Sequence, residues 1–283
     1  MKKQVFVFAA IFAAVSLLTI NVADAQWRSE THDVYNAPSG LDVTIDGNLD
    51  EWGGVMESVT GTDGSQFCGV EFEGVGGAVK VFEEHGGGKW NSADDQTVCF
   101  MIAWNPDAAY LALSVTDDEH QNSGAAWNGD AAQLAFEPTG KRTGGLALFL
   151  YNVALDNNAE KLILHNERTN GQPGLEAERD FAITRDESAK KTYYEFKFTP
   201  ANFGLDIELS EGIEIGLGIC VNDGDKAAGQ GGQKGWGGWY PHSVVHGKNS
   251  EKTGLVVLSS TAVTAVEPAD KLTTTWGTLK SER

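Results

Sequence analysis

Asp46-Gly47-Asn48-Leu49-Asp50-Glu51-Trp52 is the stretch that decides the fold. Asp and Asn side chains fix turns through hydrogen bonds to nearby backbone groups, and a tryptophan that follows such a turn buries a large ring. The apolar residues of 41–45 predict a strand that runs into this turn. We therefore expect Trp52 to be a core residue that fastens the turn against a β-structure.

The rest of the chain shows the periodicity of strands. Glycine accounts for 34 of 283 residues, and no segment beyond residue 25 keeps a helical period. Short apolar runs separated by Gly, Asn and Asp predict about eleven strands, which is typical of an all-β, two-sheet antiparallel β-sandwich of the jelly-roll type with long Gly-rich loops. The expected strands are 41–45, 78–82, 97–104, 109–116, 131–137, 146–153, 161–165, 180–185, 192–199, 212–221 and 254–259.

The strand over residues 192–199 shows the clearest alternation. Tyr194, Phe196 and Phe198 are spaced to face the core. Their neighbours Tyr193, Glu195 and Lys197 are then expected to face water.

The first 25 residues have the pattern of a secretory signal peptide. Lys2 and Lys3 precede an apolar run over 5–20, and Ala23-Asp24-Ala25 forms a cleavage site. The run is shorter than the roughly 20 residues of a membrane span, and no later stretch is apolar enough to be one. We expect a secreted protein, periplasmic or extracellular, with a lead-in over 26–40, the sandwich over 41–259 and a tail over 260–283.

The chain is strongly acidic, with a formal net charge of −19. Such a surface repels nucleic acid, because phosphate binding needs clustered Lys and Arg. An excess of carboxylates in an exported protein also fits calcium, which takes oxygen ligands. The turn that carries Asn222, Asp223 and Asp225 is the candidate calcium site, and plain turn chemistry is the alternative.

The chain contains three cysteines, Cys68, Cys99 and Cys220. One disulfide is expected in an oxidising compartment, and a Cys68–Cys99 pair would close a loop of about thirty residues. The third cysteine is then unpaired.

Three blocks carry a resemblance to a known family: Asp46–Trp52, the strand Ala109–Asp118, and Trp127-Asn128-Gly129-Asp130-Ala131-Ala132-Gln133-Leu134. Together they resemble a family 9 carbohydrate-binding module, a β-sandwich of the DOMON-like superfamily. The resemblance implies a secreted, non-catalytic protein that binds mono-, oligo- or polysaccharide and acts in carbohydrate catabolism alongside glycoside hydrolases.

In that family a sugar ring lies between two tryptophans, and polar side chains bind its hydroxyls. Trp127 matches the first tryptophan. Gln133 stands where the family has an acidic residue, and Leu148–Tyr151 where it has an arginine. The ligand-binding residues that the resemblance implies are Trp127, Asp130, Gln133 and Asp118, with Trp236, Trp239 and Tyr240 in the loop of the second tryptophan.

Other functions remain open from the sequence. A structural or adhesive protein could keep the fold without the sugar site. A haem-binding DOMON-like subunit would need an axial ligand such as Met56 or Met101, and a glycoside hydrolase would need two carboxylates about 5–9 Å apart. His242 and His246 have i,i+4 spacing, but Pro241 argues against a helical metal site.

Overall fold

The computed structural model describes residues 28–29, 32–53, 67–68, 79–122, 127–225 and 232–262. These residues form thirteen strands and several short 3-10 helices, which confirms the all-β prediction. The strands are β1 (Val34–Ser39), β2 (Phe67–Cys68), β3 (Val79–Glu84), β4 (Gln96–Asn105), β5 (Ala108–Asp117), β6 (Ala131–Glu137), β7 (Phe149–Leu155), β8 (Leu162–Arg168), β9 (Phe181–Asp186), β10 (Lys191–Phe198), β11 (Glu214–Gly224), β12 (Gln233–Trp239) and β13 (Gly254–Ala262).

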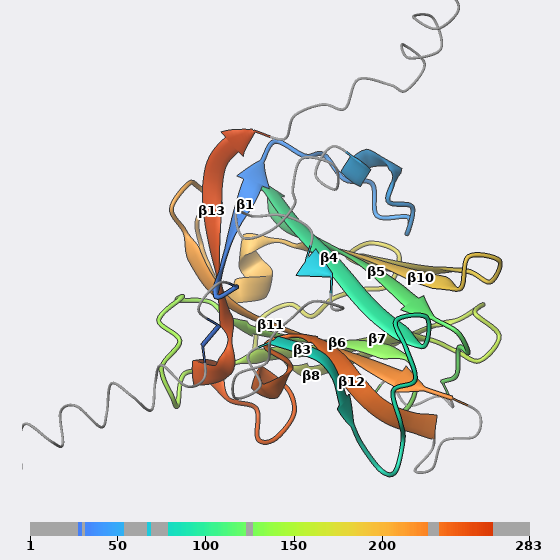
Figure 1. Cartoon of the computed structure of the whole chain (residues 1–283). Helices are drawn as coiled ribbons and strands as arrows, with labels where there is room; N and C mark the ends of the chain where they lie inside the picture. Colours follow the sequence, from blue (N-terminus) through green and yellow to red (C-terminus); the bar gives the residue numbers. More distant parts are fainter. Residues whose placement is uncertain are drawn as a thin grey trace, which may run out of the picture.

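All thirteen strands join one hydrogen-bonded sheet that folds over on itself. The strand order is β8-β7-β6-β11-β13-β1-β4-β5-β10-β9, with β12 between β11 and β3, and β2 paired to β4. In Figure 1 the layer with β4, β5 and β10 lies above the layer with β11, β6, β7, β8, β12 and β3, and β13 and β1 connect the two on the left. The result is a β-sandwich.

The pairing is antiparallel except at β1, which runs parallel to β13 and to β4. These strands are far apart in the sequence, so no tight hairpin constrains their direction. β1 lies within the segment 26–40 that we predicted as a lead-in, so the sheet begins earlier than expected.

The main core fills the space between the two layers. Inward-facing aromatic and aliphatic residues of β4, β5, β6, β7, β10 and β11 form it, and Tyr194, Phe196 and Phe198 belong to it as predicted. A smaller apolar cluster covers the outer face of β4 and β5, and another covers the outer face of β6, β7, β11 and β12. The outer faces are therefore not simply polar.

The Asp46–Trp52 stretch forms the cover over β4 and β5. Asp46 Oδ1 accepts a hydrogen bond from the Asn48 backbone N–H at 2.8 Å, and a 3-10 helix, η1 (Asp50–Trp52), follows. Trp52 is fully buried, which confirms its prediction as a core residue. Its Nε1–H donates to Glu195 Oε1 at 2.8 Å.

Glu195 corrects the alternation that we expected for β10. Its side chain is buried and also accepts hydrogen bonds from the backbone N–H groups of Asp46 and Gly47, each at 3.0 Å. The turn covers this outer face, so Glu195 faces a second core rather than water.

Cys99 of β4 is disulfide-bonded, and Cys220 is free and buried. Cys68, the remaining cysteine of the chain, lies directly opposite Cys99 in the β2–β4 pair. The pairing that the sequence predicted is therefore the one that the strand register allows.

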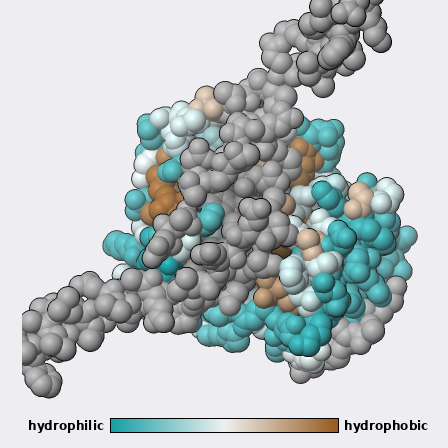
Figure 2. Space-filling view, in the orientation of Figure 1, coloured by the Kyte–Doolittle hydropathy of each residue, from teal (hydrophilic) through white to brown (hydrophobic). Residues whose placement is uncertain are grey.

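The surface shown in Figure 2 is largely hydrophilic over the described residues, with small hydrophobic patches between. None of the described segments forms a helix with the length and hydropathy of a membrane span. The predicted signal peptide and nearly all of the predicted tail lie outside the described residues.

Candidate functional site

A cleft of about 560 Å³ opens on the outer face of the layer that contains β12, β11, β6, β7 and β8. Strand alternation explains its chemistry, because the residues that do not face the main core point into it. Its lining combines aromatic rings, polar side chains and the loop after β12: His85, Trp127, Gln133, His165, Glu167, Gln233, Trp236, Val244, Val245, His246, Gly247 and Lys248.

Trp127 supplies an open aromatic face to the cleft. Its side chain is 47% exposed, although the described tryptophans of the core are buried. The Asn222 side-chain amide donates to the Trp127 carbonyl at 2.9 Å, and the Trp127 ring lies 5.2 Å from the His165 ring. The backbone is thus held while the indole remains accessible, which suits stacking on a ligand.

Trp236 lies on β12, at the opposite side of the cleft from β8, whose His165 contacts Trp127. Its ring contacts the rings of His85 at 5.1 Å and His246 at 5.7 Å. The buried Nε1–H of Trp236 has no hydrogen-bond partner among the described residues. An unpaired buried donor is costly, so it is an unusual feature in the wall of a cleft.

The polar floor comes from three adjacent strands. The register pairs Gln133 of β6 with Asn152 of β7, and Asn152 with His165 of β8. Gln133 Nε2 donates to Asn222 Oδ1 at 3.0 Å. The floor therefore presents amide and imidazole groups in a row, at a spacing of about 4.8 Å per strand.

Glu167 is the carboxylate of the cleft. Asn152 Nδ2 donates to Glu167 Oε2 at 3.0 Å, and Lys248 Nζ donates to the same oxygen at 3.2 Å. Burial acts to raise the pKa of Glu167, but the hydrogen bond from Asn152 and the charge of Lys248 outweigh it and lower the pKa. Glu167 is thus ionised at neutral pH and can accept hydrogen bonds from a ligand.

The cleft brings together three of the seven predicted ligand-binding residues: Trp127, Gln133 and Trp236. Trp239 and Tyr240 lie elsewhere, because both are buried in the main core. Trp239 Nε1 donates to the His32 carbonyl at 2.7 Å, and the Tyr240 hydroxyl donates to Asp33. Trp236 and Trp239 lie three residues apart on β12, so strand alternation turns their rings to opposite faces. Tyr240 follows the strand with φ +53°, and its ring also packs into the main core.

Asp130 and Asp118 also lie outside the cleft lining. Asp130 is buried and accepts hydrogen bonds from the backbone N–H groups of Gln121 and, at 2.9 Å, Gly224. It therefore fixes the loop before β6 to the end of β11. Asp118 is exposed beside a group of carboxylates.

Those carboxylates are Asp95, Asp223 and Asp225, whose oxygens lie within 4.8 Å of one another. Lys234 Nζ lies among them, 2.7 Å from Asp95 Oδ1, 2.8 Å from Asp225 Oδ2 and 3.5 Å from Asp223 Oδ2. Asn222, which we predicted as a metal ligand with Asp223 and Asp225, lies apart from them. Successive strand residues face opposite sides, and the Asn222 amide supports the cleft instead.

Burial shifts the pKa values of Asp223 and Lys234 in this group, and their neighbours oppose it. It raises the pKa of Asp223 to about 8, against the lowering effect of Lys234. Burial disfavours the charge on Lys234, but its hydrogen bonds to Asp225 and Asp95 prevail and raise its pKa. Asp223 therefore keeps its proton at neutral pH when no metal cation is bound beside it.

Sequence reasoning missed the five imidazole and charged side chains of the cleft: His85, His165, Glu167, His246 and Lys248. Two loops and an edge strand contribute them, and no motif links them. The positions of His165 and Glu167 at i,i+2 were the one available signal, since that spacing places both on one face of a strand.

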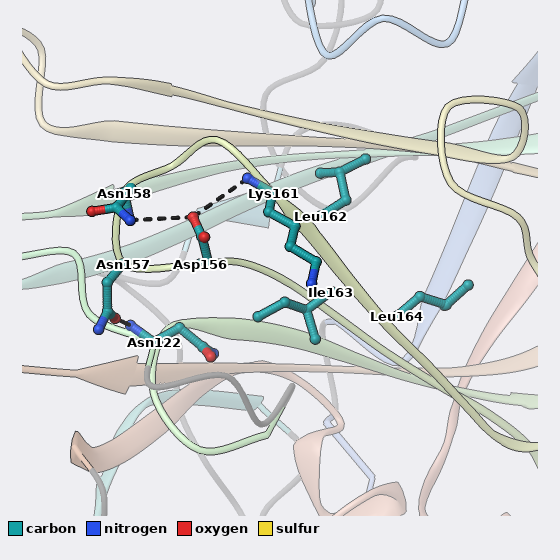
Figure 3. A pocket seen from close by; sticks show the side chains of 8 residues that line it. All are labelled: Asn122, Asp156, Asn157, Asn158, Lys161, Leu162, Ile163 and Leu164. Carbon is teal, nitrogen blue, oxygen red and sulfur yellow. Dashed lines mark hydrogen bonds between the residues drawn. The ribbon is translucent and has the colours of Figure 1, made fainter.

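A second hollow of about 570 Å³ lies at the turn between β7 and β8 (Figure 3). Its polar groups are largely engaged in the turn: Asp156 accepts the Asn158 backbone N–H at 3.2 Å, and Asn157 Oδ1 accepts that of Asn122 at 2.6 Å. The described residues that line it include no aromatic ring. The cleft with Trp127 is therefore the stronger candidate for a ligand site.

Met101, one candidate haem ligand, is fully buried in the cluster under the Asp46–Trp52 cover. Met56 lies outside the described residues.

The fold and the cleft define a β-sandwich with an aromatic and polar cleft on one outer face. The sequence model of the family described as "Carbohydrate family 9 binding domain-like" matches residues 77–261, well over half of the chain. The chain belongs to this family. No curated protein shows significant similarity to it.

Two solved structures share the fold. A family 9 carbohydrate-binding module from Caldicellulosiruptor kristjanssonii in complex with cellotriose has a TM-score of 0.53 at 13% identity, covering 83% of this chain and 98% of that chain. A family 9 module from the same organism in complex with glucose has a TM-score of 0.53 at 12% identity, covering 83% and 100%.

Proposed function

We propose that the chain is a secreted, non-catalytic carbohydrate-binding protein that holds a sugar in the cleft between Trp127 and Trp236. The observation that carries the proposal is the exposed Trp127 ring beside a polar floor, in a cleft that also contains Trp236. A sugar ring has an apolar face and equatorial hydroxyls, so it needs this combination of surfaces. Membership of the carbohydrate-binding family supports the same ligand class.

The energetics set the range of affinity that we expect. Covering one indole face removes on the order of 80 Å² of apolar surface, worth about 2 kcal/mol. Trp236 is only 4% exposed, so Trp127 supplies the open indole face, and stacking alone gives an affinity weaker than millimolar. Hydrogen bonds to a charged group add about 1.5–3 kcal/mol each. Hydrogen bonds to ionised Glu167, and weaker ones to the neutral Gln133 amide, therefore bring the affinity of an oligosaccharide to roughly millimolar or somewhat tighter.

Titration calorimetry against mono- and oligosaccharides tests the proposal, starting with glucose and cello-oligosaccharides because the similar modules were solved with these ligands. Trp127→Ala removes one stacking face, and we expect about 30-fold weaker binding, or about 2 kcal/mol. Ile207→Ala is the matched control, since Ile207 is 60% exposed and lies outside the cleft. Unchanged affinity in Trp127→Ala would remove the cleft as the site, and no binding of any sugar would favour the structural or adhesive alternative.

Export is part of the proposal and has two supports. The leader over residues 1–25 has the pattern of a signal peptide, and Cys99 forms a disulfide, which is typical of oxidising compartments. Mass spectrometry of protein collected outside the cytoplasm should find Gln26 as the first residue. An intact leader on the mature protein would contradict export by this route.

A role beside glycoside hydrolases follows from non-catalytic sugar binding. Purified protein is expected to release no reducing sugar from a polysaccharide that it binds, and to increase the yield of a hydrolase tethered to it. Release of sugar by the protein alone would instead favour the hydrolase alternative.

Calcium at Asp95, Asp223 and Asp225 remains a proposal. The donor set fits, because the three carboxylates supply the hard oxygen ligands that calcium takes, and both buried oxygens of Asp223 accept no hydrogen bond from the described residues. A calcium ion would have to displace the Lys234 ammonium group, which lies against all three carboxylates. We expect calcium to raise the Tm of chelator-treated protein, and Asp223→Asn to abolish the rise. An equal Tm with and without calcium would contradict the proposal.

A further inference from the structure

Glu83, His242 and His246 form a cluster at the rim of the cleft. Glu83 lies near the end of β3, opposite Trp236 of β12. His242 lies in the short 3-10 helix η5 (Pro241–Ser243) just after β12, and His246 lines the cleft four residues further on. The fold therefore gathers three metal-ligand side chains from two segments about 160 residues apart in the sequence.

Both imidazoles meet the same carboxylate. His242 Nε2 is 2.6 Å from Glu83 Oε2, and His246 Nε2 is 3.0 Å from Glu83 Oε1. The two rings lie 4.8 Å apart and nearly perpendicular, and one donor atom from each of the three residues lies within 4.8 Å of the others. The i,i+4 spacing brings the two histidines together without an α-helix, because the 3-10 turn that begins at Pro241 directs both side chains to Glu83.

We propose that Glu83, His242 and His246 bind a divalent transition metal ion of the Zn²⁺ class. Two imidazole nitrogens and one carboxylate oxygen are ligands that Zn²⁺ prefers, at about 2.0–2.2 Å. A tetrahedral site of that size separates its donors by about 3.3 Å, so small side-chain rotations suffice to close the present cluster on a metal ion. Metal binding at Nε2 requires a neutral imidazole with its proton on Nδ1, so a neutral ring protonated on Nε2 changes tautomer and an imidazolium releases one proton to solvent.

The exposure of the cluster permits a metal ion to enter. The His246 side chain is 53% exposed, that of Glu83 25% and that of His242 13%. A metal ion can therefore reach the cluster from solvent on the His246 side, while His242 and Glu83 hold it from the more buried side. Three protein ligands leave a fourth coordination position for water or for an oxygen of a bound molecule.

The ligand chemistry also separates this cluster from the carboxylates around Lys234. Asp95, Asp223 and Asp225 offer oxygen alone, which suits calcium, whereas two imidazoles favour a softer ion. A metal ion at His246 would fix the wall of the cleft at Trp236, whose ring is 5.7 Å from the His246 ring. Metal binding itself is independent of whether the cleft binds sugar.

Titration with Co²⁺, monitored by its visible absorption, tests the site on the purified chain. Excess Ca²⁺ is included so that the oxygen-only cluster is saturated. We expect one Co²⁺ per chain with the absorption of a nitrogen-ligated, four- or five-coordinate ion, and displacement by Zn²⁺.

Three variants locate the ion. Glu83→Gln, His242→Gln and His246→Gln should each weaken binding by more than about tenfold, since even outer-shell changes at metal sites cost 10- to 100-fold. His165→Gln is the matched control, because His165 lines the same cleft outside the cluster, and it should keep wild-type metal affinity. Circular dichroism of each metal-free variant establishes its fold, and His246→Gln removes the most exposed ligand if either other variant fails to fold.

Two outcomes overturn the proposal. One is a wild-type chain that binds no Co²⁺ in the presence of Ca²⁺. The other is wild-type affinity in folded His246→Gln together with folded Glu83→Gln, which would place the ion elsewhere.

Discussion

At the scale of single residues, Glu195 shows how one side chain joins two parts of the fold. It lies on β10, fully buried, and accepts hydrogen bonds from the backbone of Asp46 and Gly47 and from the indole of Trp52. Burial raises the pKa of Glu195, against the hydrogen bond from Trp52. The turn that decides the fold is therefore fastened to the sheet by one carboxylate.

Removing this carboxylate should destabilise the protein strongly. Glu195→Ala leaves three donors without their acceptor, and hydrogen bonds to charged groups are worth about 1.5–3 kcal/mol each. We expect a loss of about 3 kcal/mol or more in the free energy of unfolding, measured by urea denaturation. Glu195→Gln keeps one acceptor oxygen and should lose less. A loss in Glu195→Ala below about 1 kcal/mol would mean that the turn is held by other contacts.

The sequence predicted the tryptophans of the cleft and one amide, but not its charged residues. Trp127, Gln133 and Trp236 could be found from the sequence because a motif or an aromatic loop marks them. Glu167 and Lys248 could not, because their pairing across 81 residues depends on the register of β8 and on the loop after β12. Trp239 was misplaced because its segment is strand β12 rather than a loop, and residues three apart on a strand face opposite sides.

At the scale of elements, strand alternation explains most of the architecture. Ten of the eleven predicted strands were confirmed, because apolar residues recur with period two on the side that faces the main core. The prediction of a strand over 41–45 was wrong, since these residues pair with no described strand and lead into the covering turn. The outer faces were less predictable. Met101 and Tyr110 on one side, and Leu150 and Cys220 on the other, lie under covering segments that the period of a single strand does not reveal.

A substitution at Gly47 tests how closely the covering turn Asp46–Trp52 packs against β9. Its φ is +78°, and a Cβ at this position would lie 2.7 Å from Thr184 Cγ2. Gly212 is a matched control, with φ +82° and open space around the Cβ position. Gly212→Ala should cost only the backbone strain, about 1 kcal/mol, and Gly47→Ala more because of the added contact. Equal losses by urea denaturation would show that Thr184 moves away without cost.

At the scale of the whole molecule, negative charge is the recurring feature. The chain carries a formal net charge of −19, and several carboxylates are buried near the end of β11. Burial raises the pKa of Asp117 to about 6, against Arg185, and of Asp223 to about 8. Ionisation of these groups therefore costs folding free energy.

This charge predicts a pH dependence of stability. An aspartate in the unfolded chain titrates near 3.9, so the native state holds the Asp223 proton up to about pH 8 and stability falls as pH rises between these values. His120 acts in the opposite sense, because burial lowers its pKa and stability rises as pH passes the unfolded value. The comparison of wild type with Asp223→Asn isolates the carboxylate.

Urea denaturation in chelator from pH 5 to pH 8 measures the difference. Asp223→Asn should gain stability relative to wild type as the pH rises through this range. A difference that is constant with pH would contradict the raised pKa of Asp223.

Sugar binding between Trp127 and Trp236 is tested most directly by the indole N–H resonances of ¹⁵N-labelled protein during a sugar titration. We predict that the signals of Trp127 and Trp236 shift and saturate together. The signals of Trp52, Trp104 and Trp239 should stay in place, because these indoles donate to Glu195, Ser259 and His32 away from the cleft. Saturable shifts confined to the core tryptophans, or unchanged Trp127 and Trp236 signals in a protein that binds sugar, would contradict the assignment of the site.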